Sequence, residues 1–151
     1  MRTSAALAGG ALVIGSLDIT YAIAFWASRG VGATRIFQSI SAGLLGRSAA
    51  MQGGLRTALL GCLLHYFISF CIVLVYYLAS KRLRVLTERP ILCGALYGIG
   101  VYVVMNYVVI PLSATTRSKF LLSWVVCSVI VHALLIGIPA ALFSRAARSA
   151  A

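Results

Sequence analysis

Four long apolar runs dominate this chain. They extend over residues 5–27, 57–80, 91–112 and 120–143, and each is 22 to 24 residues long. An α-helix rises 1.5 Å per residue, so about 20 residues cross the ~30 Å hydrocarbon core of a bilayer. The runs lack the alternation of a membrane β-strand, and lipid offers no partners to an open backbone. We therefore expect an all-α integral membrane protein, a bundle of four transmembrane helices forming one membrane domain over residues 1–151.

The composition argues against a soluble protein. Apolar residues make up 62% of the 151 residues and charged residues 10%, where soluble domains have ~45–50% and ~25%. A soluble fold of this size leaves roughly a third of its surface exposed, so it could not hide this much apolar surface. The four cysteines lie inside apolar runs, which argues against a secreted disulfide scaffold.

The basic residues predict how the chain is oriented. There are 13 Lys and Arg residues against two acids, a formal net charge of +11. They occur in small groups between the apolar runs, which is typical of contact with lipid headgroups and not of nucleic-acid binding. Four spans place seven of them on the side of the two termini and six on the other side. The densest short connection, residues 81–90, is on the first side, so we expect both termini in the cytoplasm.

The connection between the first two runs is too long for a tight turn. Within residues 35–49, Phe37, Ile40 and Leu44 recur at helical spacing among polar residues. This pattern predicts an amphipathic helix at the membrane interface or a re-entrant segment, with an ordinary loop as the alternative. The polar residues that we expect at the interface are Arg35, Gln38, Arg47 and Arg56.

Asp18 is the most informative polar residue, because it lies about nine residues, or ~14 Å, from the end of the first run. A charge at such depth costs ~2.5–3.5 kcal/mol on insertion scales. We therefore expect its carboxyl to face the bundle interior, protonated or paired. The polar cluster predicted within the membrane comprises Asp18, His65, Asn106, Tyr107 and His132.

Several roles are open for this cluster. Buried polar side chains can simply hold helices together, and acid–histidine groups also carry protons or ions in transporters. Two histidines on different helices, His65 and His132, could be the axial ligands of one haem. The pair Asp18 and His65 could instead serve acid–base catalysis. We expect a non-enzymatic component, either an accessory subunit or a small-solute or proton pathway, with no cofactor, catalytic residue or metal site.

Small residues and prolines give packing signals. Gly94 and Gly98 form a small-xxx-small pair, which lets helices approach closely within one chain or between copies. The partners that we expect are therefore the lipid bilayer and, as an open alternative, a second copy of the chain (a homo-oligomer) or a larger membrane complex. Pro111 should end the third helix, and Pro139 should kink the fourth.

Four strings carry a resemblance to a known family: GSLDITYA, RIFQSISAGLLG, TALLGCLLH and VYVVMNYVVIPLSA. They resemble uncharacterised small four-span bacterial inner-membrane proteins, described as hypothetical membrane proteins, over most of the chain. The resemblance implies a multi-pass protein of a bacterial inner (cytoplasmic) membrane. It implies no activity and transfers no catalytic residue.

Overall fold

Helices are the only regular secondary structure over the residues that the computed structural model describes, 2–115 and 121–149, and short turns connect them. Four segments within these ranges are long and apolar enough to cross a membrane: Thr3–Ala27, Gly54–Arg82, Pro90–Leu112 and Leu122–Ser149. The all-helical architecture and the four long segments expected from the sequence are thus confirmed. The elements are α1 (Thr3–Ala27), α2 (Ala33–Leu45), α3 (Arg47–Gln52), α4 (Gly54–Arg82), α5 (Val85–Glu88), α6 (Pro90–Val104), the π-helix η1 (Met105–Val109), α7 (Ile110–Leu112), α8 (Leu122–Val131), the π-helix η2 (His132–Gly137) and α9 (Ile138–Ser149).

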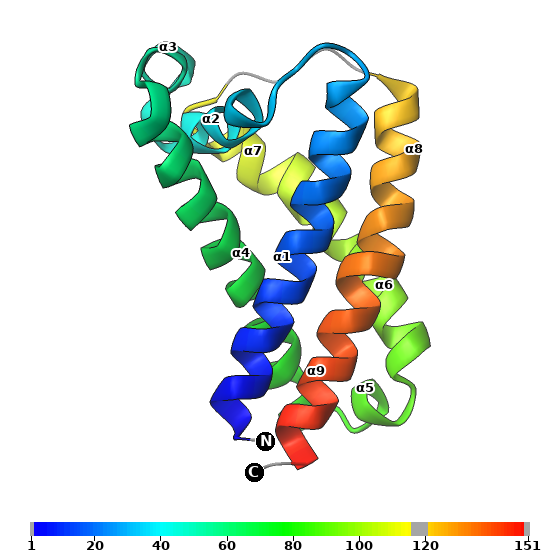
Figure 1. Cartoon of the computed structure of the whole chain (residues 1–151). Helices are drawn as coiled ribbons and strands as arrows, with labels where there is room; N and C mark the ends of the chain where they lie inside the picture. The colour runs from blue at the N-terminus through cyan, green and yellow to red at the C-terminus, as the bar shows by residue number, and fades with distance from the viewer. Residues whose placement is uncertain (1, 116–120, 150–151) are drawn as a thin grey trace.

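The long segments lie side by side, with both chain ends at one end of the molecule (Figure 1). α1 packs against α4 and α9, and α6 packs against η2 and α9. The hydroxyl of Thr3 donates to the Ala147 carbonyl at 3.3 Å, which joins the first turn of α1 to the last turns of α9. The fourth segment continues as a helix to Ser149, beyond the expected end at residue 143.

The glycine pair of the third segment is used inside the chain. A Cβ at Gly98 would collide with the carbonyl of His132, and a Cβ at Gly94 would come within 2.8 Å of the Gly137 carbonyl oxygen. α6 and η2 therefore touch backbone to backbone, as small residues permit in membrane helices. The pair does not need a second copy of the chain to explain it.

Pro111 and Pro139 each follow a π-helix. η1 ends at Val109, two residues before Pro111, and η2 ends at Gly137, two residues before Pro139. Proline lacks the N–H that an α-helix needs, and its ring presses on the preceding turn, so a wider π turn relieves both conflicts. The helix of Pro111 ends at Leu112, as expected. Pro139 follows the π turn of η2, and the helix continues beyond it as α9 to Ser149.

The prediction of one continuous helix over residues 35–49 is wrong. It breaks at Gly46, where φ is +78°, into α2 and α3, because a left-handed backbone is accessible to glycine at little cost. α2 lies across the end opposite the termini, beside α4 (Figure 1). A Cβ at Gly61 would collide with the backbone of Phe37, so α2 crosses α4 in direct contact about 10 Å along its axis from Gly54.

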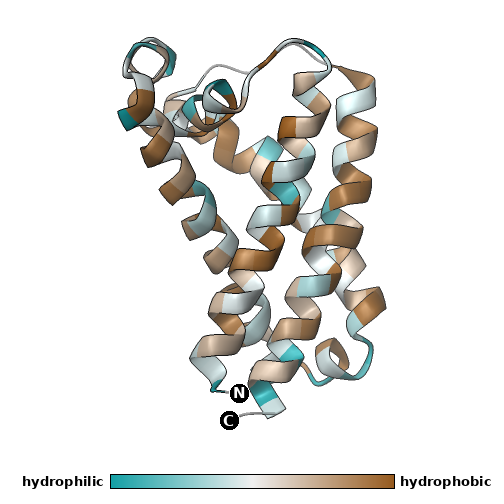
Figure 2. Ribbon diagram, in the orientation of Figure 1, coloured by the Kyte–Doolittle hydropathy of each residue, from teal (hydrophilic) through white to brown (hydrophobic). Residues whose placement is uncertain are grey.

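The outer surface is apolar along the long segments and polar at their ends (Figure 2). Leu63, Leu96 and Leu122 expose 70%, 62% and 64% of their surface. Such side chains are typical of a lipid-facing surface, since soluble monomers rarely expose contiguous apolar patches this extensive.

Candidate functional site

His65 lies at a dry seam between α1 and α4. Its side chain is only 7% exposed, and its Nε2 lies 2.8 Å from the Gly15 carbonyl oxygen. A carbonyl can only accept, so Nε2 carries the proton and donates. A Cβ on Gly15 would come within 2.9 Å of Ser69 Oγ and 2.8 Å of a Tyr66 ring carbon. The two helices are therefore in van der Waals contact on both sides of this hydrogen bond.

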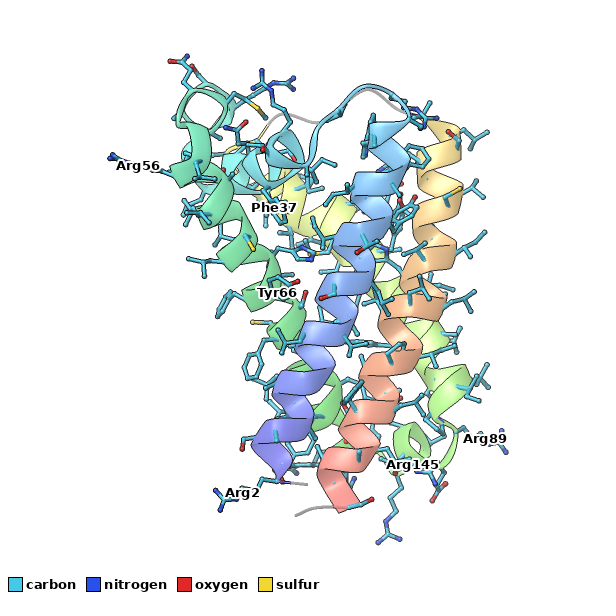
Figure 3. The ribbon with its side chains drawn as sticks, viewed as in Figure 1. Arg2, Phe37, Arg56, Tyr66, Arg89 and Arg145 are labelled. Carbon is cyan, nitrogen blue, oxygen red and sulfur yellow. The ribbon has the colours of Figure 1, made fainter. Side chains whose placement is uncertain are left out.

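Tyr66 closes the exposed edge of the same seam. Its hydroxyl lies 3.0 Å from Ser16 Oγ, and Figure 3 shows it between α4 and α1. The hydroxyl of Ser69 donates to the His65 carbonyl oxygen at 2.9 Å within α4. These contacts hold helices together, which is the role that polar side chains most often have in membranes.

Asp18 lies on the inner face of α1. Leu7, Ala11 and Ile14 precede it at helical spacing and are buried. Every buried side-chain nitrogen or oxygen in residues 2–115 and 121–149 has a hydrogen-bond partner, whereas the Asp18 carboxyl makes no hydrogen bond to that part of the chain. The carboxyl oxygens are therefore accessible and not sealed by protein, although the residue faces inward.

The helix that carries Asp18 packs against η2, and His132 on η2 lies within electrostatic range of the carboxyl. His132 Nδ1 lies 2.8 Å from the Ser128 carbonyl oxygen, so Nδ1 carries the proton and Nε2 is the nitrogen that can accept one. The Tyr102 ring packs edge-on against the imidazole, with centroids 5.4 Å apart. Tyr21, which also feels the Asp18 charge, places its hydroxyl 3.1 Å from Ser128 Oγ.

The expected single polar cluster is thus divided into two groups. His65 belongs to the α1–α4 seam, whereas Asp18 lies within electrostatic range of His132 on η2. Asn106 is half-buried and its Nδ2 donates to the Tyr102 carbonyl oxygen at 2.9 Å. Tyr107 is 64% exposed, so its placement in the interior is wrong, because the turn of η1 directs it outward from the bundle.

The residues expected at the interface also divide. Arg35, Arg47 and Arg56 are exposed, and Figure 3 shows Arg56 pointing away from α4. Gln38 is only 4% exposed, and its Nε2 donates to the Gly54 carbonyl oxygen at 3.0 Å. Its interfacial placement is corrected: Gln38 ties α2 to the start of α4, because it lies on the face of α2 that packs against the protein.

An aromatic group between α1 and α8 was not anticipated. The Trp124 ring stacks on Tyr21 with centroids 5.2 Å apart and contacts Phe25 and Trp26 at 4.9 and 5.3 Å. The guanidinium of Arg29 lies 4.1 Å from the Phe25 centroid. Tryptophan and tyrosine gather at membrane interfaces, so the two tryptophans near helix ends were the signal that would have found this group.

The structure also bears on the haem and metal alternatives. No group of three or more His, Cys, Asp or Glu side chains lies close enough to hold a metal ion within the described ranges. Ligation of haem iron by His65 Nε2 would break its bond to Gly15, at a seam with no room for a Cβ, let alone a porphyrin. The two histidines therefore do not fit as one pair of axial ligands.

Comparison with protein-family models, with curated proteins and with solved structures found no match.

Proposed function

We propose that the four long segments cross a bacterial cytoplasmic membrane with both termini in the cytoplasm, and that the protein conducts protons through Asp18 and His132. The orientation is supported by the basic residues at the end that holds the termini. These are Arg2, Lys81, Arg82, Arg84, Arg89, Arg145 and Arg148. By sequence, the connections between the first two and the last two spans carry six basic residues, so the orientation depends on the dense group at residues 81–90.

One observation carries the proton pathway: α1, which holds an accessible carboxyl at Asp18, packs against η2, which begins with the imidazole of His132. Charging a carboxyl at this depth of a membrane costs free energy. Such residues therefore occur mainly where the charge has a function or is paired with another charge. Transfer of a proton from the Asp18 carboxyl to His132 Nε2 turns two neutral groups into a carboxylate and an imidazolium. These opposite charges attract strongly in a low-dielectric surrounding, which keeps the two states close in energy.

The surroundings of His132 suit this exchange. The Ser128 carbonyl holds Nδ1–H and so fixes the tautomer, which leaves Nε2 to take up and release the proton. His132 also opens η2, and π turns are frequent at functional sites. The hydroxyls of Tyr21 on α1 and Ser128 on α8 lie within hydrogen-bond distance of each other, and Ser128 is also the residue whose carbonyl oxygen accepts from His132.

The proposal is tested by proton flux into proteoliposomes that contain a pH-sensitive dye and are energised by a potassium gradient. We expect the parent protein to conduct, and Asp18→Asn and His132→Gln each to abolish the flux. His65→Gln is the matched control, because the glutamine amide can still donate to Gly15 and the seam is not part of the pathway. Absence of flux in the parent protein, or full flux in Asp18→Asn, would overturn the proposal.

A further inference from the structure

A groove on the outer surface lies at the end that holds both termini, between the third and fourth long segments. Leu92 and Ala95 of α6 form one wall, and Leu134 of η2 and Ile138 of α9 form the other. Arg89 and Arg145 line its polar end, and its volume is about 610 Å³. Figure 3 shows both arginines at that end of the molecule, on neighbouring elements.

A smaller, polar hollow of about 390 Å³ adjoins the groove. Arg145 and Glu88 line both, and Arg148 and Thr87 line the hollow alone. The guanidinium groups of Arg89 and Arg145 make no hydrogen bond to the part of the chain that the structure describes, although their backbones do. Arg148 donates to the Ser80 carbonyl and so ties α9 to α4. Three arginines against one carboxylate leave this rim positively charged.

We propose that this groove binds one anionic phospholipid, with its phosphate at Arg89 and Arg145 and an acyl chain between α6 and η2. Leu134 lies 11 residues before Arg145, or about 16 Å along the helix axis. This length matches one leaflet of a bilayer with a ~30 Å hydrocarbon core. Arginine recognises phosphate by paired N–H donors, and basic pockets between membrane helices bind anionic headgroups.

Within the described residues, the exposed apolar face of α4 begins at a single arginine, Arg56. Leu59, Leu63 and Phe67 of α4 are 57%, 70% and 63% exposed, and they suit any acyl chain. The groove differs because an apolar channel of one-leaflet length ends at two guanidinium groups. The proposal rests on the membrane insertion proposed above, but not on proton conduction.

The test is native mass spectrometry of the delipidated protein released from detergent micelles, with phosphatidylglycerol and phosphatidylcholine of the same acyl chains. We expect phosphatidylglycerol to bind more tightly. The double variant Arg89→Gln/Arg145→Gln should weaken this binding about 30-fold, since each basic residue near an anionic lipid contributes roughly fivefold. The control Arg35→Gln/Arg56→Gln removes the same charge at the opposite end and should leave the affinity unchanged.

Two further measurements separate a lipid from a simple anion. Ala95→Phe fills the apolar channel and should weaken phosphatidylglycerol binding while both arginines remain. Inorganic phosphate, added in excess, should not displace the lipid. Equal binding of both lipids, equal losses in the two double variants, no effect of Ala95→Phe, or displacement by phosphate would each overturn the proposal. Thermal unfolding of each lipid-free variant in detergent shows whether it is folded, and this readout is independent of proton flux.

Discussion

The imidazole of His65 donates from Nε2 to the carbonyl oxygen of Gly15 across 2.8 Å. Asp18 lies only three residues further along α1, yet it interacts with His132 on a different segment. Two adjacent turns of α1 therefore lie near different histidines, which have different surroundings. The first histidine holds α1 against α4, and the second faces an accessible acid.

Loss of the interhelical hydrogen bond should destabilise the bundle. We expect His65→Phe, which keeps a ring but removes the donor, to lower the free energy of unfolding by about 0.6–2 kcal/mol. Equilibrium unfolding in mixed micelles measures this change. Tyr66→Phe removes the contact to Ser16 at the exposed edge of the seam and should cost less. An equal or larger loss in Tyr66→Phe would contradict the assignment of His65 as the main polar contact of the seam.

The contact between α6 and η2 should tolerate no added atom at Gly98. A Cβ there meets the His132 carbonyl, whereas a Cβ at Gly100, two residues on, meets nothing within 4 Å. We expect Gly98→Ala to cost about 1–3 kcal/mol through overpacking. Gly100→Ala should be neutral or stabilising, because alanine favours the helix. Melting temperatures of the two variants in detergent give the comparison, and similar values for both would disprove the close contact.

The position of α2 should depend on Gly61. A Cβ at Gly61 collides with the Phe37 backbone, whereas a Cβ at Gly43 would have its nearest contact, Ser113, at 3.7 Å. We expect Gly61→Ala to loosen α2 from α4 and to speed tryptic cleavage at Arg35 and Arg47 about fivefold or more. Gly43→Ala should be cleaved like the parent protein. Unchanged cleavage of Gly61→Ala would show that α2 is not held by this crossing.

The proposed orientation can be tested with two exposed serines at opposite ends. Ser48 lies in α3, and Ser149 ends α9. A membrane-impermeant maleimide should label Ser48→Cys in spheroplasts, and Ser149→Cys only after the membrane is permeabilised. The parent protein, with its native cysteines, gives the background. Labelling of Ser149→Cys in sealed spheroplasts would reverse the orientation.

Much of the architecture could be predicted from the sequence. The lengths of the apolar runs predicted four long helices within three residues of their ends, except that the fourth continues to Ser149 instead of ending at residue 143. The agreement follows because backbone hydrogen bonding and hydrophobicity act locally. The sequence predicted an amphipathic helix in the connection before α4, but it did not predict the break of this helix at Gly46. Arg35, Arg47 and Arg56, which were predicted at the interface, are exposed, whereas Gln38 is buried against the start of α4.

The sequence by itself determined that the chain is helical, that four helices are apolar over a membrane-spanning length, and that Asp18 lies far from any helix end. Only the tertiary structure decided that the helix of Asp18 packs against the π-helix of His132, that His65 bonds to Gly15, and that the glycines of α6 pack within the chain. The physical reason lies in helix rotation. A helix that is apolar on every side, such as α1, has no hydropathy pattern to show which face turns inward. That choice depends on where small residues let backbones touch.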